Sequence, residues 1–277
     1  MRCSAHVPFS CTALLSFGRL CFATALVFWG AQHLYFGDFV TRAMPRWPDG
    51  APLRAASPYL LGALFVICGT AIALARQPRR AALLVSILVS AGFVFLAIPA
   101  AFNDVLLGGT WTHAGKALVI AAGALVVAST FPVEPQSPTD RLFVLVGRLA
   151  LGTFLFHSGI QHFVWADFVH TLVPAWMPGR AFWTYFTGVA LLAGGLGLFV
   201  PRTARPAALA SGAMTLAWLL LVHIPRAFVT VRDANEATAL FEALAFSGLA
   251  FLLAAQTAPV LAPLTPQSTA SPLPPAS

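Results

Sequence analysis

Long apolar stretches separated by short polar groups are the main pattern of this chain. Eight of them carry few charges and approach the roughly 20 residues that a helix needs to cross the hydrocarbon of a bilayer. A helix satisfies its backbone N–H and C=O groups within one segment, which that environment requires. We therefore predict an all-α membrane protein with eight transmembrane helices, at 14–36, 58–75, 81–101, 115–132, 142–165, 183–200, 207–224 and 238–256.

The glycine and polar positions of the first half return in the second. Gly18-Arg19-Leu20 recurs as Gly147-Arg148-Leu149, at an offset of 129 residues, and Ile98-Pro99 recurs as Ile224-Pro225, at an offset of 126. The difference falls in a loop, where an insertion costs little. The pattern predicts a tandem duplication. Its parts are a four-helix repeat at 1–132, a linker at 133–141, a second four-helix repeat at 142–257 and a disordered Pro-, Ser- and Thr-rich tail at 258–277.

The orientation follows from the even number of spans in each repeat. Both repeats enter the membrane from the same side, so we expect them to be parallel, around a pseudo-twofold axis along the membrane normal. Nine basic residues lie on the side of the two termini and seven on the other side. Because basic residues favour the cytoplasmic side, both termini are predicted to be cytoplasmic. Five tryptophans gather on the opposite side, as in an interfacial belt: Trp47, Trp111, Trp165, Trp176 and Trp183.

The composition supports lipid as the surrounding medium. Hydrophobic residues make up 58% of the chain and charged residues 9%, whereas a soluble domain carries about a quarter charged residues. The net charge of +7 does not indicate nucleic-acid binding, because the basic residues form short clusters between apolar stretches. Five arginines in these clusters are typical of topology charges that contact lipid phosphate: Arg76, Arg79, Arg80, Arg202 and Arg205.

The four cysteines show no C-x-x-C spacing. We interpret them as small apolar residues of helices, outside any disulfide framework or thiol redox pair. The sequence also offers no cofactor motif and no acid–base dyad, so an enzyme is less favoured than a binding or accessory protein.

The most specific polar pattern is Gly-x-Gln-His followed by an Asp five residues after the His. Polar side chains at membrane depth are costly and tend to face an interior or a cavity. Three interpretations of the histidines remain open: bonding to backbone carbonyls or to the aspartates, a polar pocket for a quinone-like molecule, and metal or haem ligation by one His from each half. The residues of this pattern are Gln32, His33, Asp38, Gln161, His162 and Asp167.

Two further features carry hypotheses. Lys116 and Glu242 stand at equivalent positions of the fourth and eighth spans, and we expect them to pair across the pseudo-twofold, although each alone could reach interfacial water. Trp176 lies in a Pro-rich loop that is interpreted as an interfacial turn, with a lid over a ligand pocket as the alternative.

Several motifs of the second half resemble bacterial membrane proteins of the DoxX/DoxD-like group, a four-helix unit. They are Gly159-Ile160-Gln161-His162-Phe163, Asp167-Phe168, Val173-Pro174-Ala175-Trp176-Met177-Pro178 and Tyr185-Phe186-Thr187-Gly188-Val189. As two copies, the resemblance covers nearly the whole chain. It implies a bacterial inner membrane and, for some members, a link to respiratory or sulfur redox chemistry through quinones. Many relatives place a Glu two residues after the Gly-Val motif, but Ala63, Leu64 and Ala190 occupy this region here, which puts a proton relay through that carboxylate in doubt.

The function expected from the sequence is an accessory or quinone- or lipid-binding component of a membrane redox process. Quinone is the candidate ligand, the bilayer is a partner, and a membrane redox protein is the candidate protein partner. The alternative is a small-molecule transporter that works at the interface of the two repeats.

Overall fold

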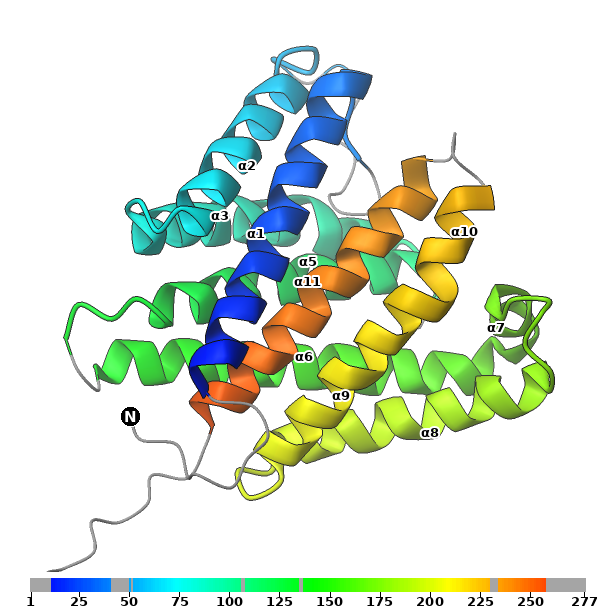
Figure 1. Ribbon diagram of the computed structural model, residues 1–277. Coiled ribbons are helices and arrows are strands. Elements are labelled where there is room, and N and C mark those ends of the chain that lie inside the picture. Colours follow the sequence, from blue (N-terminus) through cyan, green and yellow to red (C-terminus); the bar gives the residue numbers. More distant parts are fainter. Residues whose placement is uncertain are drawn as a thin grey trace, which may run out of the picture.

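The computed structural model describes residues 11–40, 50, 52–105, 108–134, 137–229 and 234–257. This part of the chain is helical and contains no strand (Figure 1). Two π-helical turns, η1 (Phe93–Ala97) and η2 (Leu219–His223), join α3 to α4 and α9 to α10. The helices are α1 (Cys11–Phe36), α2 (Ser57–Ala73), α3 (Pro78–Gly92), α4 (Ile98–Phe102), α5 (Gly109–Ser129), α6 (Pro138–Val164), α7 (Ala166–Leu172), α8 (Arg180–Phe199), α9 (Ala204–Trp218), α10 (Ile224–Val229) and α11 (Ala234–Gln256).

Seven helical segments of the described part are long and apolar enough to cross a membrane, namely α1, α3 to α4, α5, α6, α8, α9 to α10, and α11. The structure is thus that of an all-helical, multi-pass membrane protein. The remaining predicted span, α2, is apolar but has 17 residues. At 1.5 Å per residue it is about 26 Å long, which is less than the roughly 30 Å of hydrocarbon.

Several helices differ from their predicted bounds. α5 begins at Gly109, six residues before the predicted start of the fourth span, and α6 begins at Pro138, inside the predicted linker. These extensions contain polar or aromatic residues, which lower the hydropathy without preventing a helix. α7 was not predicted, because seven residues are too few for a periodic signal. The predicted tail and Trp47 lie outside the described residues.

The two π-helical turns have a common cause in the sequence. Each is followed directly by an Ile-Pro pair, at Pro99 and Pro225. A proline inside a helix has no N–H to donate, and its ring clashes with the carbonyl four residues earlier. The wider turn before each proline accommodates this clash and lets the helical segment continue.

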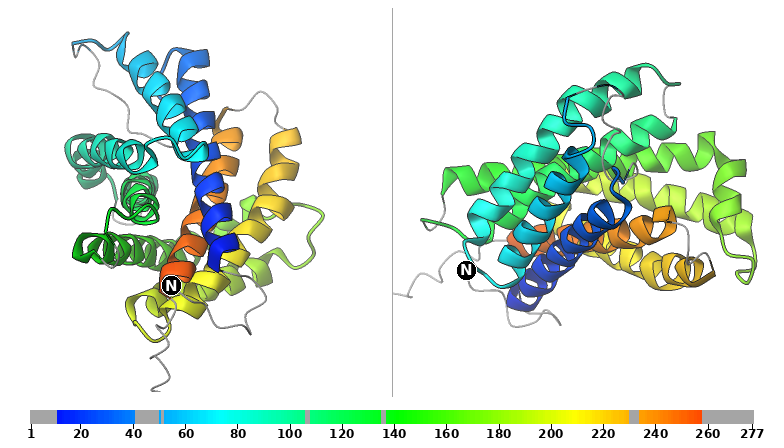
Figure 2. Two further views of the ribbon diagram at one scale, coloured as in Figure 1. Left: turned by 60° about the vertical axis from the view of Figure 1, so that its left-hand side comes forward. Right: turned by 90° about the horizontal axis from the view of Figure 1, so that it is seen from above.

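The centre of the molecule is formed by α5 and α11. In the most apolar part of α5 and of α11, 72% and 78% of the residues are buried. In the other five long segments the buried share is 28–39%. α1 packs between α2 and α11, and α6 packs between α8 and α5 (Figures 1 and 2). The first helix of each half of the chain therefore packs against the last helix of the other half. The core between them contains Phe22, Leu26, Trp29 and Leu249.

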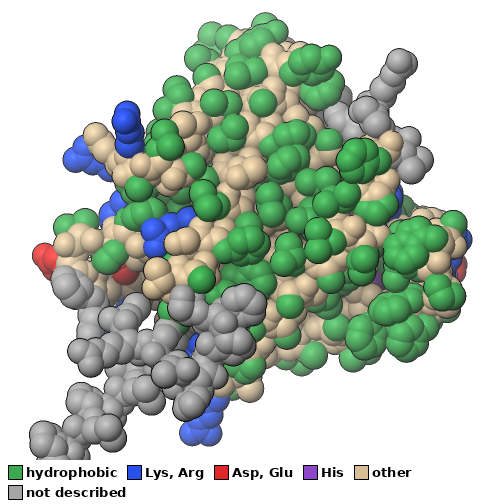
Figure 3. Space-filling model, viewed as in Figure 1, with side chains coloured by type: hydrophobic (Ala, Val, Ile, Leu, Met, Phe, Trp, Pro, Cys, Tyr) green, Lys and Arg blue, Asp and Glu red, His purple; other side chains and the backbone are tan. Residues whose placement is uncertain are grey.

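The chain crosses the bundle up and down, which gives the bundle two ends. We name the end with residues 130–134 and 137 the linker end, and the end with α7 and Trp111 the tryptophan end. Exposed hydrophobic side chains cover the face shown in Figure 3, while Lys and Arg side chains gather mainly at its left and lower edges, near the loops that follow α2 and α8. An apolar surface with arginines in the flanking loops is typical of a protein that lies in a lipid bilayer.

The cysteines agree only in part with the sequence-based interpretation. Cys21 and Cys68 are free and buried among apolar residues. Cys11, however, is disulfide-bonded, and the spacing of the cysteines gave no sign of this.

Candidate functional site

His33 is enclosed near the end of α1, with none of its surface exposed. Its Nδ1 lies 2.7 Å from the carbonyl oxygen of Trp29, and its Nε2 lies 3.4 Å from the backbone N–H of Val40. A neutral imidazole with its proton on Nδ1 satisfies both contacts, donating to the carbonyl and accepting from the amide. Both ring nitrogens of His33 are thus occupied within the protein. This arrangement favours the first interpretation of this histidine, bonding to a backbone carbonyl.

Asp38 fixes the chain that folds back over His33. Gly37, in the left-handed conformation with φ of +62°, ends α1, and its N–H donates to the carbonyl of His33. Asp38 Oδ1 then accepts from Arg54 Nη2 at 2.8 Å and from the N–H of Phe39 at 2.7 Å. The aspartate therefore holds the end of α1 and the turn before α2 together.

His162, the counterpart of His33 in the second half, is only partly buried. Its Nδ1 makes the same contact, 2.8 Å from the carbonyl oxygen of Ser158. Val169 is the counterpart of Val40, but its backbone N–H donates to the carbonyl of Trp165, the residue before α7. Among the described residues nothing bonds Nε2 of His162, so this histidine keeps one ring nitrogen for another molecule.

The second half also lacks the ion pair that closes the first. Asp167 and Arg180 are the counterparts of Asp38 and Arg54, and both are exposed. Within the described part of the chain they do not form an ion pair, whereas Asp38 and Arg54 do. Near His162, Tyr185 contacts the rings of Phe163 and His170. The same pattern of residues is thus closed in the first half and open in the second.

The two glutamines join the halves. Thr238 on α11 donates to Gln32 Oε1 on α1 at 3.0 Å, in a buried contact. Gln161 on α6 and Thr112 on α5 lie within hydrogen-bond distance through both their nitrogen and oxygen atoms, at 2.8 and 3.0 Å. Adjacent residues on a helix point about 100° apart, yet Gln32 and His33 in α1 are both buried.

Lys116 and Glu242 form an ion pair between the two central helices. Lys116 Nζ lies 2.6 Å from Glu242 Oε2, and the two side chains are 10% and 5% exposed. Lys116 follows the predicted start of the fourth span by one residue. Because α5 begins at Gly109, Lys116 lies about two turns, or roughly 10 Å, from the start of the helix.

Trp176 lies in the turn between α7 and α8, and 59% of its surface is exposed. The turn is closed by the N–H of Met177, which donates to the carbonyl of Pro174. An exposed indole is what the interpretation as an interfacial turn expects, and that interpretation stays a prediction.

Metal or haem ligation by one histidine from each half is the third interpretation of the histidines. The described residues contain no group of three or more His, Cys, Asp and Glu side chains placed to hold a metal ion. Both nitrogens of His33 are occupied, so the pairing of one histidine from each half on a haem iron does not fit this geometry.

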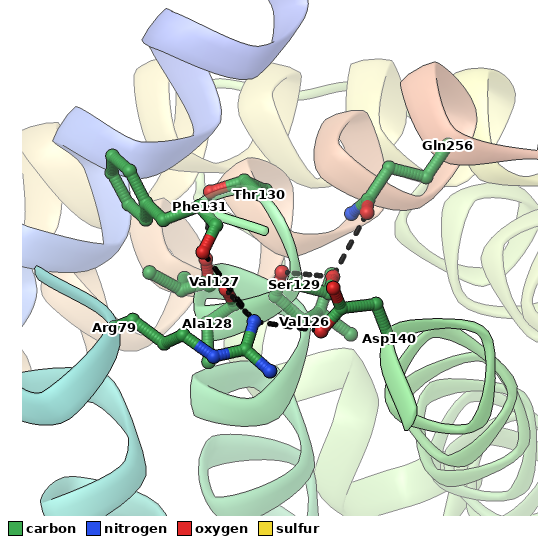
Figure 4. A network of polar contacts seen from close by, with 9 residues as sticks. All are labelled: Arg79, Val126, Val127, Ala128, Ser129, Thr130, Phe131, Asp140 and Gln256. Carbon is green, nitrogen blue, oxygen red and sulfur yellow. Dashed lines mark hydrogen bonds and ion pairs between the residues drawn. The ribbon is translucent and has the colours of Figure 1, made fainter. Parts of the chain in front are cut away.

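Arg79 has a role that the sequence did not indicate. Its Nη1 donates to Asp140 Oδ1 at 2.7 Å and to the carbonyls of Ala128 and Phe131 at 3.0 and 3.4 Å (Figure 4). The interpretation of Arg79 as a lipid-contacting topology charge is therefore wrong: it ties α3 to the end of α5 and the start of α6. A signal was present in Asp140, an acid that has no counterpart in the other half.

A comparison with protein families gives one match. A family model described as a domain of unknown function (DUF8561) matches residues 151–250. No curated protein and no solved structure matches the chain.

Proposed function

We propose that this protein is a DoxX/DoxD-like component of a bacterial inner membrane, built from two parallel four-helix repeats with eight spans and with both termini in the cytoplasm. Paired contacts support the duplication. Gln32 with Thr238 and Gln161 with Thr112 join equivalent positions in opposite directions, and the two π-helical turns lie 126 residues apart. The family match at 151–250 also falls wholly within the second repeat.

The proposed activity is the binding of a quinone-like amphipathic molecule at the tryptophan end of the second repeat, in support of a membrane redox partner. The observation that carries it is the free Nε2 of His162 on a partly buried ring. A protonated or unprotonated imidazole nitrogen can bond a quinone oxygen or hydroxyl, and the exposed ring of Tyr185 contacts the ring of Phe163, the residue after His162. Of the two histidines in the sequence pattern, this proposal uses His162 alone.

The test is to identify the quinones that copurify with the protein in mild detergent by mass spectrometry. His162→Ala is expected to lose the bound quinone. The matched control is His33→Asn, whose side-chain amide can still donate to the carbonyl of Trp29, and this variant is expected to retain it. Wild-type protein without quinone, or equal quinone in wild type and His162→Ala, would show the proposal to be wrong.

A transporter is the second candidate, and the buried Lys116–Glu242 pair favours it. Charged side chains inside the membrane commonly mark a substrate or ion pathway, and this pair lies where the two halves meet. Counterflow of labelled solutes in proteoliposomes distinguishes the two candidates, since a binding component would give no flux.

A further inference from the structure

The Lys116–Glu242 pair leaves hydrogen-bonding groups unused. Glu242 Oε2 accepts a hydrogen bond from Lys116. Glu242 Oε1 has no partner among the described residues, and water does not reach it easily because only 5% of the side chain is exposed. Trp29 is 0% exposed, and its indole N–H also has no partner there. Buried polar groups are nearly always bonded to protein or to a bound molecule. An unused donor and an unused acceptor therefore point to a third participant.

The register of α1 against α11 places these groups together. The two helices run antiparallel. The Gln32–Thr238 hydrogen bond and the stacked rings of Phe28 and Phe241 show which residues of α1 lie at the same height as which residues of α11. Trp29 and Glu242 each follow a residue of the stacked pair. One step along a helix turns the side chain by about 100°, and in antiparallel helices the two steps turn to the same side of the interface. Lys116 reaches Glu242 from that side.

Polar side chains lie on only one side of the Lys116–Glu242 pair along α5 and α11. Thr112 and Thr238 lie four residues, about one turn, from Lys116 and Glu242 toward the tryptophan end, and both are bonded to glutamines. One turn in the other direction stand Ile120 and Phe246, which are buried in the apolar core. The polar positions thus form a column that begins at the tryptophan end and stops at the ion pair.

We propose that Lys116, Glu242 and Trp29 form a binding site for a small monovalent anion that enters together with a proton. The proton adds to the Glu242 carboxylate, forming an O–H bond. The anion takes the place of that carboxylate beside the Lys116 ammonium and accepts a second hydrogen bond from Trp29. No electron is transferred, and the site is neutral before and after the exchange.

Charge balance explains why the two events are coupled. A proton alone on Glu242 would leave the Lys116 ammonium buried without a partner, and an anion alone would add a second negative charge. Either state is strongly unfavourable in a low-dielectric interior. Only the joint arrival preserves one opposite charge for the ammonium. Proton and anion therefore bind and leave together.

Other charged and titratable groups also lie on the elements that pack against α11. Arg226 on α10 pairs with Glu236 at the start of α11, and both nitrogens of His33 on α1 are bonded. The others are Arg19, Cys21 and Tyr35 on α1, His113 on α5, Asp140, Arg141, Arg148, His157 and His162 on α6, Arg205 on α9 and His223 on η2.

This inference rests on the transport candidate and is independent of quinone binding at His162. The experiment loads the full-length protein into liposomes and measures uptake of radiolabelled lactate and of radiolabelled chloride, with and without an inward proton gradient. Protein-free liposomes correct for passive entry. We expect the gradient to raise the uptake of at least one anion severalfold above that background.

Variants then distinguish an effect of the proposed site from a general effect of a substitution on α11. Glu242→Gln is expected to abolish the response to the proton gradient, while Glu236→Gln, on the same helix and also at an ion pair, keeps it. Trp29→Phe removes only the N–H and is expected to raise KM for the anion about tenfold, the effect of one hydrogen bond to a charged group. This variant also tests the site should Glu242→Gln not fold.

The outcomes are decisive in each direction. No uptake of either anion above background overturns the inference together with the transport candidate. Uptake that ignores the proton gradient, or that Glu242→Gln leaves unchanged, overturns the coupling and keeps transport.

Discussion

Arg79 Nη1 lies 2.7 Å from Asp140 Oδ1, so the first turn of α3 is bound directly to the first turn of α6. The same guanidinium nitrogen donates to the carbonyls of Ala128 and Phe131 at the end of α5. A cation at the carboxyl end of a helix is also favoured by the helix dipole. One side chain thus joins three elements at the linker end and connects the two halves of the chain there.

We predict that Arg79→Met lowers the free energy of unfolding by about 2 kcal/mol, because it removes charge-assisted hydrogen bonds and leaves Asp140 without this partner. The matched control is Arg205→Met. Arg205 is the counterpart of Arg79, but its Nε and Nη2 have no partner within the described part of the chain. Thermal unfolding in detergent should show Arg79→Met melting several degrees below Arg205→Met. Equal melting temperatures would contradict this role of Arg79.

The Lys116–Glu242 pair predicts a rescue by charge exchange. Lys116→Glu alone places two carboxylates in contact, and Glu242→Lys alone places two ammonium groups in contact. Each is expected to destabilise the protein by about 3–5 kcal/mol, the range for breaking a buried pair. The double exchange restores one charge of each sign and should recover most of the folded yield by size-exclusion chromatography. A double variant less stable than both single variants would rule out a stabilising pair.

Much of this fold could be predicted from the sequence, because apolar stretches of similar length and the same polar positions occur in both halves of the chain. Uncharged stretches of about 20 residues indicate helices in lipid irrespective of their packing, and the equal offset of Lys116 and Glu242 brought two distant residues into one hypothesis. The structure pairs them. Helix bounds were less accurate, as at Gly109, because hydropathy falls in the interfacial turn before the helix ends.

The different states of the two histidines could not be predicted from the sequence. His33 and His162 stand in the same local pattern, and only the structure shows that Val40 bonds the first ring while Val169 bonds within α7. That difference depends on whether the following residues form a helix, which is decided by tertiary contacts. The Arg79–Asp140 bond likewise joins residues 61 apart with no periodic signal between them.

Close backbone contact between α1 and α2 gives a third prediction. A Cβ added to Gly30 would lie 2.6 Å from the carbonyl oxygen of Gly62, and these are backbone atoms that cannot turn away. Gly30→Ala is therefore expected to destabilise the protein by about 1–3 kcal/mol through overpacking. Gly109→Ala is the control, because no atom lies within 4 Å of its added Cβ. Chemical denaturation of both variants should separate them, and an equal stability would show that α1 and α2 can move apart freely.

Asp104 gives a prediction for the pH dependence of stability. The hydroxyl of Thr110 donates to Asp104 Oδ2 at 2.6 Å, and the backbone N–H groups of Val105 and Thr110 also donate to this carboxylate. These bonds, the Thr110 hydroxyl first, lower the pKa of Asp104 in the folded protein below its ordinary value of about 4. The charged form is therefore favoured by folding. Its contribution to stability is complete above the unfolded pKa and is lost as the pH falls through the lower, folded pKa. Asp104→Ala should accordingly differ most from wild type in thermal scans above about pH 5 and converge with it in strong acid, whereas a constant difference at every pH would assign the effect to helix packing instead of the carboxylate.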